Sequence, residues 1–184
     1  MLAALLQANP RDQEALYNLG MVYSDQGRLD EAQQLLRQAT EVAPDHAHAW
    51  IALGVAYLRA RNPGAARPAL ERALALEPRD PYALRTLGSL HAMTGDAAGA
   101  IGLLEQARAL APDDPIILLT LAQALLSQDP AAHAAAADGL LIRVLALSPQ
   151  GALAEQAKNA RRTIANHTFR SKAVGELRHD AILY

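Results

Sequence analysis

The chain has 184 residues, of which 51% are hydrophobic and only 4% are aromatic. This excess of small and aliphatic residues favours helices that pack closely against one another. The absence of cysteine excludes disulfide bonds and thiolate metal sites. The formal net charge of -2 argues against a basic surface that attracts nucleic acid.

The charge is distributed unevenly along the chain. Residues 1–150 contain 11 arginines and 16 acidic residues, whereas residues 151–184 contain six basic and three acidic residues. The basic end could contact an acidic partner or a phosphate surface, although a solvated end of the fold is the simpler interpretation.

The sequence predicts no membrane insertion, because it contains no run of 18 apolar residues. The first residues have no basic segment and reach Gln7 too soon for a signal peptide. We therefore expect a cytoplasmic protein; a periplasmic location stays open if the chain is a fragment.

Residues 2–8 have the pattern of the last turns of a helix that ends before Pro10. Pro10 precedes Pro44 by the same interval that separates Pro44 from Pro78, so residues 1–10 match the end of an earlier repeat. The chain is either capped by this partial repeat or cut from a longer protein, and we favour the second interpretation.

One pattern then recurs three times at a constant interval, which predicts repeats at 13–46, 47–80 and 81–114. Four residues at the spacing of one helix face are followed by Ala, Leu, Ala and a closing Pro. The glycine of the first helix and the first alanine of the second let the two helices approach closely. In the second copy the pattern consists of Trp50, Leu53, Gly54, Tyr57, Ala66, Leu70, Ala73 and Pro78.

This pattern resembles the tetratricopeptide repeat, in which W-x2-L-G-x2-Y is followed by Ala, a large apolar residue and Pro, with a period of about 34 residues. The resemblance implies an all-α fold, a right-handed α-solenoid or superhelix of stacked antiparallel helix pairs. It also implies an interaction scaffold, with ligands lying on a concave face that the first helices of the repeats line.

Capping residues mark the helix starts independently of the hydrophobic pattern. Asn62-Pro63, Asp80-Pro81, Asp114-Pro115 and Asp129-Pro130 each combine a capping side chain with proline at the first helical position. A fourth repeat, residues 115–150, closes at Pro149 and contains three inserted residues, so we expect a second helix longer by nearly one turn.

The end of the chain is predicted to hold two further helices. Residues 151–166 present one apolar and one charged face, which suits a capping helix at the end of a stack. The run Asn166-His167-Thr168 predicts an interruption, and residues 170–184 then form an amphipathic tail helix. This tail is expected to dock on the stack of its own chain or of a neighbour, or to begin a further element.

No catalytic or cofactor motif is present, so we predict that the chain is not an enzyme and holds no cofactor. His46 and His48 have no third ligand nearby in the sequence and point apart on a helix, so no metal site is predicted. Asp113 and Asp114 lie between two prolines and are explained by a turn and a helix cap. His91 stands where the pattern has tyrosine and is expected to be packed.

A second stripe of residues runs along the first helices and predicts a largely apolar groove for a protein or peptide partner. Tetratricopeptide proteins that grip the carboxylate end of chaperone tails carry Lys and Asn there, whereas the matching positions here hold Tyr17, Met21 and Ala52. Arg85 and Gln123 would fix the register of the ligand. The predicted groove residues are Tyr17, Met21, His48, Ile51, Val55, Leu58, Tyr82, Arg85, Ser89, Leu119 and Gln123.

The favoured hypothesis is a scaffold that binds a peptide or helical segment of a partner in this groove. Two alternatives remain open. The repeats could be the docking or regulatory arm of a larger protein with catalysis elsewhere, or they could form a homo-oligomer through the C-terminal helix.

Overall fold

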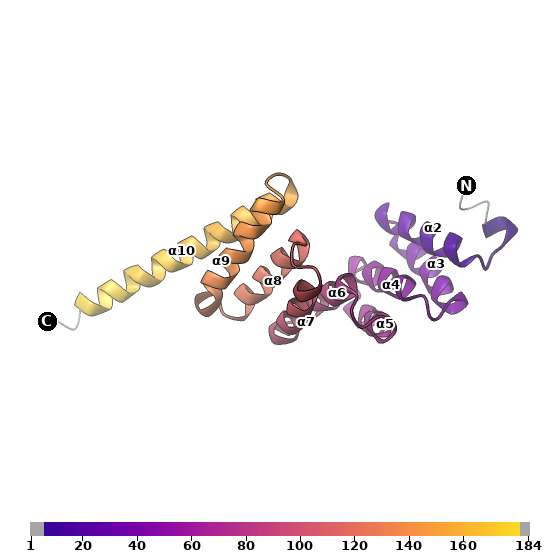
Figure 1. Cartoon of the computed structure of the whole chain (residues 1–184), viewed down its shortest axis with the longest axis horizontal. Coiled ribbons are helices and arrows are strands. Elements are labelled where there is room, and N and C mark those ends of the chain that lie inside the picture. The colour runs from indigo at the N-terminus through magenta and orange to yellow at the C-terminus, as the bar shows by residue number, and fades with distance from the viewer. Residues whose placement is uncertain (1–5, 181–184) are drawn as a thin grey trace. The chain divides into compact units, whose positions relative to one another are not determined.

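The computed structural model describes the backbone of residues 6–180 and the side chains of residues 6–166. Within that range every regular element is a helix, so the predicted all-α fold of helix pairs is confirmed (Figure 1). Residues 6–8 are helical, and the rest of the predicted N-terminal helix lies outside the described residues. The longer helices are α2 (Gln13–Asp25), α3 (Leu29–Val42), α4 (Ala47–Arg59), α5 (Pro63–Leu76), α6 (Pro81–Met93), α7 (Ala97–Leu110), α8 (Pro115–Gln128), α9 (Pro130–Leu147) and α10 (Ala152–Asp180).

The helices belong to two compact units, Met1–Thr94 and Gly95–Tyr184. In the first unit α2 pairs with α3 and α4 pairs with α5, while α4 also contacts the first helices on either side of it, α2 and α6. In the second unit α7 packs against α8, α8 pairs with α9, and α10 packs against α9 and α8.

The predicted capping residues begin their helices as expected. The side chain of Asn62 accepts a hydrogen bond from the backbone N–H of Ala65, and that of Asp80 accepts one from Ala83. Asp114 and Asp129 cap α8 and α9 in the same way. Asp12 and Asp96 also cap helices, although they were not among the predicted caps.

The turns after the first helices share one left-handed position in each of the first three repeats. Gly27, Arg61 and Gly95 occupy equivalent repeat positions and have φ angles of 77°, 57° and 87°. A left-handed conformation costs a residue with a side chain about 1 kcal/mol. Arg61 nevertheless adopts it, because the residue that follows makes the same hydrogen bond in both turns. The N–H of Asn62 donates to the carbonyl of Tyr57, just as the N–H of Arg28 after Gly27 donates to the carbonyl of Tyr23.

The core follows the sequence period. The Ala, Leu and Ala of the second helices in the first three repeats are completely buried. In the fourth repeat the three-residue insertion shifts the equivalent positions to 137, 141 and 144, where Val stands in place of the last Ala. The buried sets are Ala32, Leu36 and Ala39; Ala66, Leu70 and Ala73; Ala100, Leu104 and Ala107; and Ala137, Leu141 and Val144.

Glycine at the middle of the first helix allows the close packing of each pair in the first unit. A Cβ atom on Gly54 would lie 2.6 Å from Cγ of Leu70, and one on Gly20 would lie 2.7 Å from Cγ of Leu36. Both distances are shorter than van der Waals contact. The leucine of the second helix therefore occupies the space that a side chain on the first helix would need.

Helix α9 has 18 residues, whereas α3, α5 and α7 each have 14, which confirms the predicted lengthening by about one turn. Its length and mean hydropathy of 1.3 would also allow it to cross a membrane. However, α9 packs against α8 and α10 in the structure, and its Asp138 and Arg143 pair with Arg161 and Asp113. The buried positions of α9 are Ala137, Leu141 and Val144, and 17% of the helix is buried.

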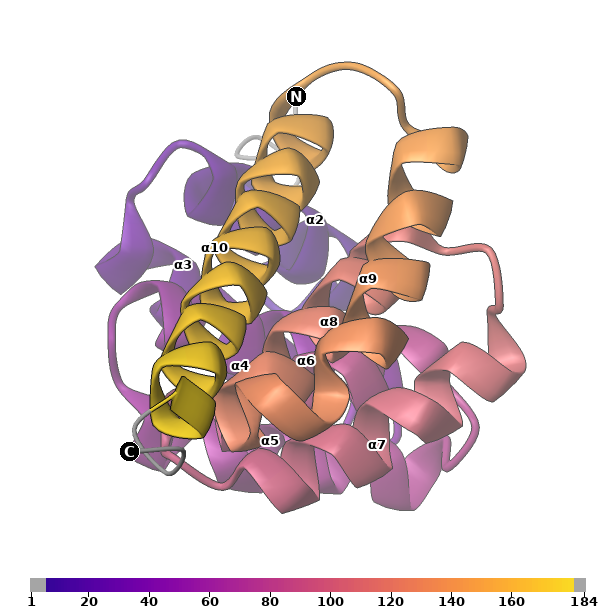
Figure 2. The same cartoon turned by 90° about the vertical axis from the view of Figure 1, so that its left-hand side faces the viewer.

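The predicted interruption at residues 166–168 is wrong, because α10 is a single helix of 29 residues (Figure 2). Asn, His and Thr are only moderately poor helix formers, unlike Pro or Gly, so they do not end a helix that is already under way. The predicted capping helix and the start of the tail helix are therefore one element. The side chains of the tail and residues 181–184 lie outside the described part.

Replacing Gly54 by alanine tests the close contact within a helix pair. We expect Gly54→Ala to lower the free energy of unfolding by about 1–3 kcal/mol, because the new methyl group overlaps Leu70. Gly102 is the matched control: it lies inside α7 and a Cβ atom there would have no atom within 4 Å, so Gly102→Ala should raise stability by about 0.5–1 kcal/mol. Urea denaturation measures both; equal effects would contradict the packing argument.

Candidate functional site

The first unit contains a pocket of about 150 Å³ on the face formed by α2, α4 and α6. Because these three helices contact one another in succession, the residues at equivalent positions of successive repeats converge there. The pocket is lined by Tyr17, Met21, Ser24, Asp25, His48, Ile51, Ala52, Val55, Arg59 and Tyr82.

Six of the predicted groove residues line this pocket: Tyr17, Met21, His48, Ile51, Val55 and Tyr82. They differ in exposure. Ile51 is only 2% exposed, whereas Tyr82 is 43% exposed. Ile51 is therefore buried between α4 and its neighbouring helices and does not offer an open surface. A change at Ile51 would test the core, whereas a change at Val55, which is half-buried, tests the pocket wall.

Three other predicted residues of the first unit do not line the pocket. Leu58 is half-buried on α4. The guanidinium of Arg85 lies 4.5 Å from the ring centroid of Tyr82, and the Ser89 hydroxyl donates a hydrogen bond to the Arg85 carbonyl. Arg85 thus stacks on an aromatic residue of its own helix, which is a cation–π contact.

The last two predicted residues, Leu119 and Gln123, belong to α8 in the second unit. Leu119 is 3% exposed and packs in a core cluster with Leu141 of α9 and Ala157 of α10. It is therefore a core residue and not a groove residue, because α10 covers α8 as the first helix of a following repeat would. Gln123 is exposed.

An ion pair at the edge of the pocket was not predicted from the sequence. Nη1 of Arg59 lies 3.1 Å from Oδ1 of Asp25 and donates a second hydrogen bond to Oγ of Ser24. The interaction links α4 to α2. Its signal was present in the sequence, since Asp25 and Arg59 occupy the same position of successive repeats with opposite charges.

Tyr17 forms one wall of the pocket and packs edge-on against His46, with 5.2 Å between the ring centroids. Burial raises the pKa of the Tyr17 phenol above its ordinary value of 10.0, and the charge of Tyr82 raises it further. Tyr17 is therefore a neutral phenol at physiological pH. It offers the pocket an apolar ring with a polar tip.

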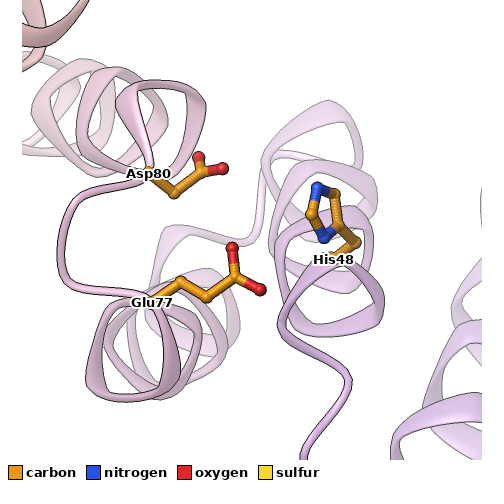
Figure 3. A group of neighbouring side chains, drawn as sticks. All are labelled: His48, Glu77 and Asp80. Atoms are coloured by element: carbon orange, nitrogen blue, oxygen red, sulfur yellow. The ribbon is translucent and has the colours of Figure 1, made fainter.

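Beside the pocket, the structure brings together three side chains that could hold a cation. The ligand atoms of His48, Glu77 and Asp80 all lie within 4.8 Å of one another (Figure 3). This group was not predicted from the sequence, because both carboxylates follow the next helix along the chain, well beyond the neighbours of His48.

Comparison with family models decides the identity of the repeats. Two models described as tetratricopeptide repeat match residues 12–79 and 51–115. The chain belongs to the tetratricopeptide repeat family. No curated protein matches the sequence of this tetratricopeptide repeat protein significantly.

Solved structures of similar fold include other tetratricopeptide repeat proteins. A thermophilic protein of this type from Thermus thermophilus is 25% identical, with 86% of each chain covered and a TM-score of 0.74. Pseudomonas aeruginosa pilF is 24% identical, with 87% of this chain and 73% of the other covered and a TM-score of 0.72. The protein MamA is 24% identical, with 80% of this chain and 79% of the other covered and a TM-score of 0.67.

Tetratricopeptide repeats serve generally as scaffolds for protein interactions, and this general role applies to the present chain. The pocket on α2, α4 and α6 is consistent with it, since a mostly apolar lining with a few polar groups at its edge is typical of binding sites.

The ionisation of Tyr17 should make stability depend on pH in the alkaline range. The unfolded chain ionises this phenol near its ordinary pKa, whereas the folded chain keeps it protonated to a higher pH. Its contribution to stability is therefore complete below about pH 10 and is lost as the pH rises through the folded pKa. In urea denaturation at about pH 9 and about pH 11, the wild type should lose more stability than Tyr17→Phe. Equal losses would show that Tyr17 ionises as freely in the folded chain as in the unfolded chain.

Proposed function

We propose that the pocket of the first unit binds one apolar anchor side chain from an extended or helical segment of a partner protein. The observation that carries the proposal is a pocket of about 150 Å³ whose lining includes Met21, Val55 and the rings of Tyr17 and Tyr82. Most of these side chains are partly exposed, so a ligand would remove apolar surface from water.

The volume of the pocket limits what the anchor can be. An apolar cavity of about 150 Å³ accommodates a group of the size of benzene. One phenylalanine, leucine or methionine side chain therefore matches the space, whereas the side chains of a whole helical turn do not. Burial of one such side chain contributes roughly 1.5–3 kcal/mol.

Polar groups at the edge of the pocket would orient the segment that carries the anchor. The Arg59–Asp25 pair is well exposed, and the imidazole of His48 lies on the other side of Ile51 along α4. Neighbouring contacts must supply the rest of the affinity, because a dissociation constant of 1 μM corresponds to about 8 kcal/mol. The partner is thus expected to lie across several first helices, with one residue inserted into the pocket.

Selection from a random peptide library tests the proposal without a known partner. Peptides selected on the full chain should share one large apolar residue, and a selected peptide should bind at least about tenfold more weakly to Val55→Glu, because the carboxylate would be desolvated by the anchor. Fluorescence anisotropy of the labelled peptide measures the affinity. The melting temperature of Val55→Glu should stay close to that of the wild type, because Val55 is only half-buried.

Ile142→Glu provides the matched control for the charge. Ile142 is an apolar residue that is 49% exposed on α9 and does not line the pocket. This variant should bind the peptide as the wild type does. Equal binding by wild type and Val55→Glu, or equal weakening by both variants, would contradict the pocket as the binding site.

A second candidate function is self-association through α10, favoured by the length of this helix. At 1.5 Å per residue, its 29 residues extend about 43 Å, whereas the 18 residues of α9 extend about 27 Å. In the part of α10 whose side chains the structure describes, Leu153, Ala157 and Ile164 pack on the neighbouring helices. A short amphipathic helix is only marginally stable alone in water, so we propose that residues 170–184 dock on their own chain or on a neighbouring copy.

Amide hydrogen exchange over residues 170–184 at several protein concentrations distinguishes these arrangements. Protection that increases with concentration supports self-association, and protection independent of concentration supports docking within one chain. Exchange at the rate of an unstructured peptide at every concentration would contradict both. The amides of residues 153–164 serve as the internal reference, because this part of α10 packs against the core.

A further inference from the structure

We propose that His48, Glu77 and Asp80 form a binding site for a divalent transition-metal ion such as Zn²⁺. His48 lies in the first turn of α4, Glu77 follows the last residue of α5, and Asp80 precedes the first residue of α6. Their potential ligand atoms lie within 4.8 Å of one another, and the three side chains converge from two directions (Figure 3).

Backbone hydrogen bonds fix the turn that carries Glu77 and Asp80. The N–H of Glu77 donates to the carbonyl of Ala73, and the N–H of Asp80 donates to the carbonyl of Glu77, which closes the turn between α5 and α6. Oδ1 of Asp80 also accepts a hydrogen bond of 2.6 Å from the N–H of Ala83. One oxygen of Asp80 is thus used for the helix cap, and the other remains available as a ligand.

The electrostatics of the group favour a cation. Two carboxylates at this separation repel each other unless a positive charge lies between them. Among the described side chains, neither Glu77 nor Asp80 forms an ion pair with an arginine or lysine. The imidazole nitrogen of His48 is the third group facing them, and it is a transition-metal ligand when neutral.

The donor set of one nitrogen and two oxygens selects the class of ion. Zn²⁺ binds imidazole and carboxylate at about 2.0–2.2 Å, and such bonds in a tetrahedron separate the ligand atoms by roughly 3.4 Å. The three atoms must therefore approach by up to about 1.4 Å, which the exposed side chains of His48 and Glu77 can achieve by rotation. Mg²⁺ and Ca²⁺ prefer ligand sets made only of oxygen, so the imidazole favours a transition metal.

A bound ion would connect α4 to the turn between α5 and α6, and it would keep a coordination position open, since this group supplies three protein ligands. His48 also lines the pocket, so the ion would fix the imidazole at the pocket edge. The site is thus placed to couple metal binding to the stability of the second repeat.

Isothermal titration of the full chain with ZnCl₂, after removal of metals with a chelator, tests the site. We expect one Zn²⁺ per chain. His48→Ala, Glu77→Gln and Asp80→Asn should each weaken binding by at least about tenfold, the loss that even an indirect change near a metal causes. Asparagine is also a good helix cap, so Asp80→Asn removes the charge while α6 keeps its start.

His133→Ala is the matched control, because it removes another histidine, one whose ring hydrogen-bonds to Gln128 and not to this group. It should bind Zn²⁺ as the wild type does. As a second readout, saturating Zn²⁺ should raise the melting temperature of the wild type and of His133→Ala, but not that of His48→Ala. The proposal is overturned if the wild type binds no stoichiometric Zn²⁺, or if His48→Ala and Glu77→Gln bind it and respond to it as the wild type does.

Discussion

The fold of the first unit depends on the contact between a glycine of each first helix and a leucine of the following second helix. The Leu70 side chain fills the space beside Gly54, and Leu36 does the same beside Gly20. This contact sets how closely the two helices of a pair approach, and it recurs from one repeat to the next. The left-handed turn recurs with the same period and even forces Arg61 into a conformation that glycine adopts more easily. Pair geometry and turn geometry therefore support each other.

The same close packing determines the character of the pocket. Because α4 contacts both α2 and α6, the residues between these helices are buried, and Ile51 forms the floor of a small cavity. The longer side chains of Tyr17, Met21 and Tyr82 surround it. Equivalent repeat positions meet there, which is how Asp25 and Arg59 become an ion pair. Binding through a single inserted side chain follows from this geometry better than binding along a continuous apolar groove.

The turn between α5 and α6 connects the packing of the repeats to the proposed metal site. Its hydrogen bonds end one helix and begin the next, and the turn carries the two carboxylates that lie near His48. Since His48 belongs to both the metal group and the pocket lining, ligand binding at the pocket and metal binding at the turn would share one side chain. The two proposals rest on different observations and can fail separately.

The sequence by itself determined the features that depend on local chemistry and on the repeat period: the helix pairs, the capping residues, the buried Ala-Leu-Ala positions and the longer α9. These follow from hydrogen bonding at helix ends and from the helical periodicity of apolar residues. The sequence also predicted six of the residues that line the pocket. Only the tertiary structure decided that Ile51 and Leu119 are buried, because burial depends on which helix covers the stripe. The tertiary structure alone brought Glu77 and Asp80 close to His48. The whole of α5 separates these residues in the chain, so their proximity depends on how the helices stack and not on any local pattern.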